Sequence, residues 1–200
     1  MRITIENEIL KAELESFGAE LKSLVSKKDS QEYMWEADPA FWGKTSPILF
    51  PFIGKLEGAA YNYNDKKYVA DKHGFARDME FQATDVGEDY AVFMLEDNIE
   101  TKSQYPYRFK LYVKYYFEND RLVTRFRVIN PSSKVIYFSL GGHPAFNCPL
   151  DEGLSFNDYY VEYEKNETII QPVPGGERTV LCDENKLYMP RELFDFDVIM

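Results

Sequence analysis

Hydrophobic and polar residues alternate most regularly in the second half of the chain. In a first run, Tyr107 to Phe117, every second side chain is apolar or aromatic. A polar break, Glu118 to Asp120, is followed by a second alternating run that ends at Asn130. Alternation with a period of two is typical of half-buried strands, and a short polar break between two such runs is typical of a hairpin. A third run, Val135 to Leu140, lies between turn residues, so we predict three consecutive antiparallel strands.

Shorter runs of the same kind occur upstream, separated by turn residues at intervals of roughly ten residues, as in β-sandwiches and barrels. Helical patterns are scarce. The best are residues 38–43, where Asp38 precedes Pro39 as a helix N-cap, and residues 98–104. Two hundred residues suffice for one domain and are too few for two full enzyme domains, so we predict a single all-β domain over residues 1–200.

The charge balance narrows the choice of partners. The chain has 34 acidic and 23 basic residues, a net charge of −11, and a pI near 4.7. This balance argues against nucleic acid or an anionic membrane surface as a partner. No stretch approaches the roughly 18 apolar residues of a membrane span, and the N-terminus lacks a signal-peptide pattern, so we expect a cytoplasmic protein. The two cysteines, Cys148 and Cys182, predict neither a disulfide framework nor a zinc cluster.

Three segments break the strand pattern and concentrate glycine, proline, histidine and charge. They are residues 46–58, 71–78 and 139–147. The chain has only two histidines, His73 and His143, and each lies beside glycine in one of these segments. A loop histidine is more often structural or solvated than catalytic. The shared setting of the two residues favours a common site in one cleft, while the lack of closely spaced metal-ligand motifs disfavours a metal.

Two cations and two tryptophans in or near these segments could have either a structural or a substrate-binding role. Lys55 and Arg77 are either surface cations or donors to substrate oxygens, and Arg77 is the more suggestive because it follows His73 by four residues. Trp35 and Trp42 are more readily explained by packing than as a platform for a sugar ring. No glycine-rich phosphate-binding motif is present in the sequence, so no nucleotide cofactor is indicated.

Four motifs, "LFPFIGKL", "HGFARDMEF", "YPYRFKL" and "GGHPAFN", in this order and at these spacings, carry a resemblance to a known family. The chain resembles the aldose 1-epimerase (galactose mutarotase-like) family, and within it the bacterial LacX-type subgroup, from "ITIEN" essentially to Met200. The resemblance implies an all-β supersandwich of large antiparallel sheets with a sugar cleft on a concave sheet face. The chain would then form roughly the N-terminal two-thirds of that fold.

The resemblance also implies roles for particular residues. His143 would be the general acid that protonates the ring oxygen of a sugar, and His73 would hold or polarise the sugar near that oxygen. The arginine that family members commonly carry falls at Lys55, which keeps the charge and loses the planar fork of arginine. An acidic residue that grips sugar hydroxyls falls at Asp197. Mutarotation is a proton-transfer isomerisation of a small-molecule sugar, so the implied enzyme is an isomerase that needs no cofactor.

The family's catalytic base, a glutamate in the C-terminal part, has no counterpart in this sequence. The run "LFDFDVIM" stops inside a strand-like pattern, so we expect a fragment of a longer protein, with a chain that has lost its base as the alternative. Two other functions stay open. One is a hexose-phosphate epimerase in which Lys55, Lys72 or Arg77 engages the phosphate, and the other is a non-catalytic carbohydrate-binding or sensor protein. The sequence carries no signal for a particular sugar or for an oligomeric state.

Overall fold

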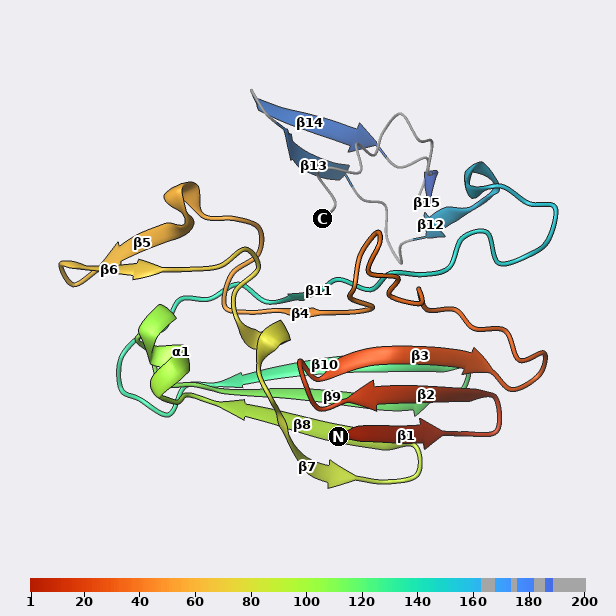
Figure 1. Ribbon diagram of the computed structural model, residues 1–200, viewed down its shortest axis with the longest axis horizontal. Helices are drawn as coiled ribbons and strands as arrows, with labels where there is room; N and C mark the ends of the chain where they lie inside the picture. The colour runs from red at the N-terminus through yellow and green to blue at the C-terminus, as the bar shows by residue number, and fades with distance from the viewer. Residues whose placement is uncertain (163–167, 174–175, 182–185, 189–200) are drawn as a thin grey trace. The chain divides into compact units, whose positions relative to one another are not determined.

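The computed structural model describes residues 1–162, 168–173, 176–181 and 186–188. The chain divides into two compact units, residues 1–147 and 148–200, of which the first contains both histidines (Figure 1). Within the described residues all paired strands of the named sheets are antiparallel, and the only α-helix is α1 (Ile99–Gln104). The predicted all-β class is therefore confirmed. The single domain remains a prediction.

The first unit contains two larger sheets and two short strand pairs. One sheet has the order β1-β2-β3, formed by β1 (Arg2–Glu6), β2 (Leu10–Glu15) and β3 (Glu20–Ser26). The other has the order β10-β9-β8-β7, formed by β7 (Gln82–Val86), β8 (Tyr90–Glu96), β9 (Lys110–Glu118) and β10 (Arg121–Ile129). The short pairs are β4 (Ile48–Leu49) with β11 (Gly141–Gly142), and β5 (Ala60–Tyr63) with β6 (Lys66–Val69).

In the second unit, the described strands form two pairs. They are β12 (Tyr160–Glu162) with β15 (Lys186–Tyr188), and β13 (Thr168–Val173) with β14 (Gly176–Leu181). Among the described residues, short 3-10 turns occupy residues 57–59, 76–78 and 156–158. Cys182 and Asp197 lie outside the described residues.

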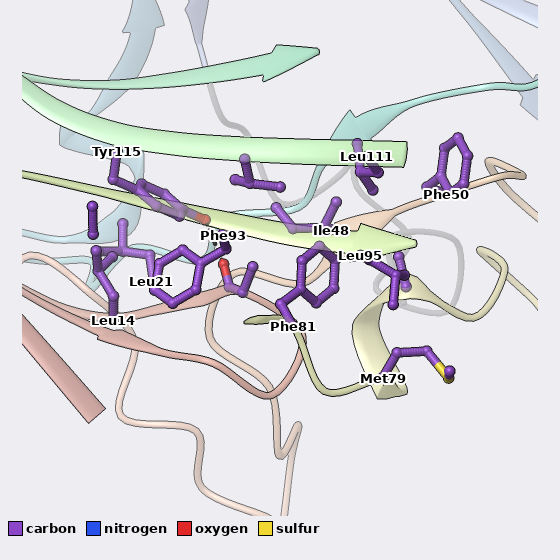
Figure 2. Close-up of a cluster of buried hydrophobic side chains, with 14 of the residues drawn as sticks. Leu14, Leu21, Ile48, Phe50, Met79, Phe81, Phe93, Leu95, Leu111 and Tyr115 are labelled. Carbon is purple, nitrogen blue, oxygen red and sulfur yellow. Dashed lines mark hydrogen bonds between the residues drawn. The ribbon is translucent and has the colours of Figure 1, made fainter. Parts of the chain in front are cut away.

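The core of the first unit lies between the two larger sheets. Alternate residues of β2, β8 and β9 are buried, as their polar and apolar alternation requires. Figure 2 shows Leu14 and Leu21 directed at Phe93 and Tyr115 within this cluster. Each fully buried side chain of this size contributes about 1.5–3 kcal/mol of transfer free energy. Tyr115 also donates a hydrogen bond of 2.8 Å to the carbonyl of Ala19, and burial raises the pKa of this tyrosine.

The predicted hairpin is confirmed, whereas the predicted third strand is wrong. Strands β9 and β10 pair from Glu118 with Arg121 onward, and Asn119 in the connection has a φ of +56°. Asparagine tolerates this left-handed conformation better than most residues, which suits it to the turn. Residues 135–140 form no strand. Instead, the Ser139 N–H donates to the carbonyl of Pro51, so the segment leaves the hairpin and follows a different part of the chain.

One of the two predicted helices is present. In α1, the Asn98 side chain accepts a hydrogen bond from the Thr101 N–H, and the Thr101 hydroxyl accepts one from the Asn98 N–H. Residues 38–43 form a turn and not a helix, because the Asp38 carbonyl accepts hydrogen bonds from the Phe41 and Trp42 N–H groups and no further helical turn follows. In the part of the chain that the structure describes, no helix is long and apolar enough to cross a membrane.

Candidate functional site

Residues 45–54, here called the central segment, hold the loop that carries His143. Strands β4 and β11 pair Ile48 with Gly142. Beyond this pair, the His143 N–H donates to the carbonyl of Pro47 over 3.1 Å. The Ala145 N–H donates to the carbonyl of Thr45 over 2.8 Å. The backbone on both sides of the imidazole is therefore fixed to one short stretch of chain.

The same central segment holds the loop that carries His73. The His73 N–H donates to the carbonyl of Gly54 over 2.9 Å, and the Phe75 N–H donates to the carbonyl of Phe50 over 3.1 Å. Between them, Gly74 has a φ of +72°, and a Cβ atom there would lie 2.3 Å from the Phe50 carbonyl oxygen. Glycine has no Cβ, so Gly74 lets the loop of His73 lie close to the central segment.

Because both loops bind the central segment, the two histidines meet. The ring centroids of His73 and His143 lie 5.9 Å apart, and the ring planes are inclined at 77°. The structure thus brings together the pair singled out in the sequence. At this separation both imidazoles can bind the same small molecule, because a hydrogen bond from a ring nitrogen to a ligand atom spans about 3 Å.

The environment of His73 fixes its protonation state. Its side chain is buried, with 9% of its surface exposed, and Nδ1 accepts a hydrogen bond of 3.0 Å from the Gly54 N–H. Burial lowers the pKa of His73 to about 4, with further contributions from Lys72, Arg77 and His143. At neutral pH the ring is therefore neutral, and its single proton is on Nε2. His73 can donate one hydrogen bond through Nε2 without carrying a charge.

The remaining predicted site residues are Arg77, Lys55 and Asp197. The Arg77 Nε atom lies 3.3 Å from Asp78 Oδ2, while its guanidinium is near enough to lower the pKa of His73. Lys55 directly follows Gly54 and is exposed. Asp197 lies outside the described residues. Among the described residues no group of three or more His, Cys, Asp or Glu side chains could hold a metal ion.

Trp42 is a neighbour of His143, and the sequence alone favoured packing over a sugar platform as the role of its ring. Its ring centroid lies 5.0 Å from that of His143, with the planes inclined at 45°. The signal that pointed to it was its position just before the central segment.

The described part of the chain is thus an antiparallel all-β fold in which two imidazoles lie close together, one of them neutral. The chain belongs to the aldose 1-epimerase family, whose model matches residues 1–185. It is 36% identical to the chromosomal protein LacX of Lactococcus lactis subsp. lactis over an alignment of 214 residues, which covers 100% of this chain and 71% of that protein. The predicted family and LacX-type subgroup are thereby confirmed.

Solved structures with the same fold support this assignment. A galactose mutarotase related enzyme from Lactobacillus acidophilus has a TM-score of 0.90 and 34% identity over 98% of this chain and 67% of its own. A galactose mutarotase-like protein from Lactobacillus casei has a TM-score of 0.86 and 37% identity over 98% of this chain and 69% of its own. The predicted galactose mutarotase-like class of fold is confirmed by these likenesses.

Proposed function

We propose that the protein interconverts the α and β anomers of a hexose by acid-base ring opening. Membership of the aldose 1-epimerase family supports an isomerase acting on a sugar. The single observation that carries the proposal is the approach of the two imidazoles to 5.9 Å, with His73 neutral and His143 partly exposed. One ring can then hold the substrate while the other transfers a proton.

In this mechanism His143 gives a proton to the ring oxygen while a base removes the proton of the anomeric hydroxyl. The bond between C1 and the ring oxygen breaks, and an open-chain aldehyde with a free hydroxyl forms. Rotation about the bond to C1 and the reverse proton transfers close the ring on the other face. A positioned acid typically contributes about 10²–10⁴-fold to such a step. We assign no base among the residues that the structure describes.

His73 supports the reaction as a neutral donor. Its Nε2–H binds the sugar near the ring oxygen, and its Nδ1 is occupied by the Gly54 N–H, so the ring has one orientation and one tautomer. Because His73 is uncharged, it does not compete with His143 for the role of acid. Arg77 and Lys55 are proposed to donate to sugar hydroxyls, and Asp197 is proposed to accept from them.

Anomer exchange measured by polarimetry or saturation-transfer NMR tests the proposal. The purified protein should accelerate equilibration of fresh α-glucose or α-galactose above the buffer rate. A His143→Gln variant, which keeps the size and polarity of the side chain, should lose at least about 100-fold in rate. An equal rate in the variant, or no acceleration by the protein, contradicts the proposal. Sugar binding without any exchange would favour a carbohydrate-binding protein instead.

A second candidate is a hexose-phosphate epimerase. The observation in its favour is that Lys72 and Arg77 both lower the pKa of His73, so two cations lie near the buried imidazole, and exposed Lys55 directly follows Gly54. Cations near the site suit a phosphate group. If this candidate is correct, kcat/KM for glucose 6-phosphate should exceed that for glucose, and Lys72→Ala should reduce only the value for the phosphate. Equal values for the two sugars would exclude it.

A further inference from the structure

The indole of Trp42 packs against the imidazole of His143, a contact that the proposed chemistry does not use. Their ring centroids are 5.0 Å apart, with the planes inclined at 45°. An aromatic face at this distance attracts a neutral ring by packing and a cation by its quadrupole, which acts within about 6 Å of the ring centroid. Trp42 therefore suits both protonation states that a histidine acid passes through.

The backbone of Trp42 is connected to the loop of His143 through Trp35. The Trp42 N–H donates to the carbonyl of Asp38 over 2.8 Å, which closes the turn. The Nε1–H of Trp35 donates to the carbonyl of Trp42 over 3.0 Å, and the Trp35 N–H donates to the carbonyl of Ala145 over 3.0 Å. Trp35 thus connects the backbone of Trp42 to the chain two residues beyond His143.

We propose that Trp42 is a positioning residue for His143, whose indole keeps the imidazole in one orientation throughout its cycle of proton loss and gain. The inference rests on the proposed function, because it assigns to Trp42 the orientation of the acid of that reaction. Trp42 acts through His143. Its effect should therefore fall on the proton-transfer step and leave substrate binding nearly unchanged.

Fluorescence tests the contact without any turnover. The chain has two tryptophans, so a Trp42→Phe variant leaves Trp35 as its only indole. An imidazole in contact with an indole quenches its emission, so His143→Gln in the otherwise unchanged protein should raise the emission at pH 7. The same substitution in the Trp42→Phe background should leave the emission unchanged. An equal change in both backgrounds, or no change in either, would overturn the proposal.

Steady-state kinetics test the consequence for the acid. Trp42→Ala should lower kcat by about 10-fold or more, because a small misplacement of a catalytic group is costly, with KM within about twofold of the unchanged protein. Trp42→Phe retains an aromatic face and should stay within about threefold. Far-UV circular dichroism verifies that both variants fold. Equal kcat values for the two variants would overturn the proposal. A fluorescence response that depends on His143 in a protein with no anomer exchange would instead contradict the proposed function.

Discussion

The carboxylate oxygen Oε1 of Glu20 lies 2.6 Å from the backbone nitrogen of Thr45 and accepts its hydrogen bond. The same oxygen accepts the Ser46 N–H over 2.9 Å, while Oε2 lies 3.4 Å from Lys22 Nζ. Only 3% of Glu20 is exposed. A buried carboxylate at the start of β3 therefore holds the first two residues of the central segment, directly before Pro47, which binds the backbone of His143.

Removing this carboxylate should destabilise the protein. In Glu20→Ala, two buried N–H groups lose their acceptor. Each hydrogen bond to a charged group contributes about 1.5–3 kcal/mol, so the free energy of unfolding should fall by about 3–6 kcal/mol. Urea denaturation measures the change. The control is Glu96→Ala, which breaks a partly exposed pair with Lys110 at 3.2 Å and should cost no more than about 1 kcal/mol. Equal losses in the two variants would show that Glu20 is not an anchor.

Gly74→Ala should be more damaging than Gly58→Ala, although both glycines have positive φ. A Cβ atom at Gly74 would lie 2.3 Å from the Phe50 carbonyl oxygen, so the loop of His73 must move away from the central segment. Gly58 has a φ of +63° with open space around it, so Gly58→Ala costs only the backbone conformation, about 1 kcal/mol. Thermal denaturation should show a clearly larger loss for Gly74→Ala, accompanied by loss of anomer exchange. Similar losses in both variants would contradict the close approach.

Acidification should weaken the fold through His73. A histidine whose pKa falls from 6.5 in the unfolded chain to about 4 in the folded protein binds its proton more weakly when folded. Its contribution to stability is therefore complete above pH 6.5 and is lost as the pH falls toward 4. The His73→Asn variant, which retains an acceptor for the Gly54 N–H, should lack this part of the pH dependence.

Two measurements check this expectation. Urea denaturation at pH 7 and pH 4.5 compares the two proteins, so that carboxylate titration, common to both, cancels in the difference. Long-range ¹H–¹⁵N NMR at pH 7 should show the His73 proton on Nε2, as the hydrogen bond from Gly54 to Nδ1 requires. The same loss of stability in both proteins, or a proton on Nδ1, would be incompatible with the buried neutral ring.

The hairpin of β9 and β10 could be predicted from sequence because its partners are adjacent and its alternation is long. Residues 135–140 have equally good strand residues, yet they form no strand, since Ser139 bonds to Pro51, far away in the sequence. A local pattern does not contain such a partner. The turn at residues 38–43 has the sequence signals of a helix start, but the bonds from Trp35 to Trp42 and Ala145 hold a single turn there.

The same reasoning explains what could be predicted of the candidate site. In the sequence each histidine is next to a glycine, which indicated that the backbone of both loops could adopt unusual conformations. It could not give the distance between the two imidazoles. That distance depends on hydrogen bonds between residues far apart in sequence: Phe50 binds the loop of His73, and Pro47 binds the loop of His143. The neutral state of His73 depends in turn on the Gly54 N–H and on burial, and neither is visible before the chain is folded.

A last prediction concerns the ion pair between Lys44 and Asp78, which connects the start of the central segment to the loop of His73. The Lys44 Nζ atom lies 2.8 Å from Asp78 Oδ1 and also donates to the carbonyl of Arg77 over 3.1 Å. Lys44 directly precedes the central segment, and Asp78 ends the turn that follows His73. The Lys44 side chain is 21% exposed, and its ammonium group lies 5.5 Å from the ring centroid of Phe17. Partial burial and the additional contacts should make this pair stronger than an ordinary surface pair.

A double-mutant cycle with Lys44→Met and Asp78→Asn should therefore give a coupling energy of about 1 kcal/mol in urea denaturation. The matched cycle uses Lys27→Met and Glu6→Gln, an exposed pair at 3.1 Å, and should give less than about 0.5 kcal/mol. Salt should reduce the second coupling more than the first, because screening acts mainly on exposed charges. If the two coupling energies are equal and both vanish in salt, the Lys44–Asp78 pair stabilises the loop of His73 no more than an ordinary surface pair would. A larger coupling for Lys44 would show that the loop of His73 is also held from the side of the central segment where His143 is bound.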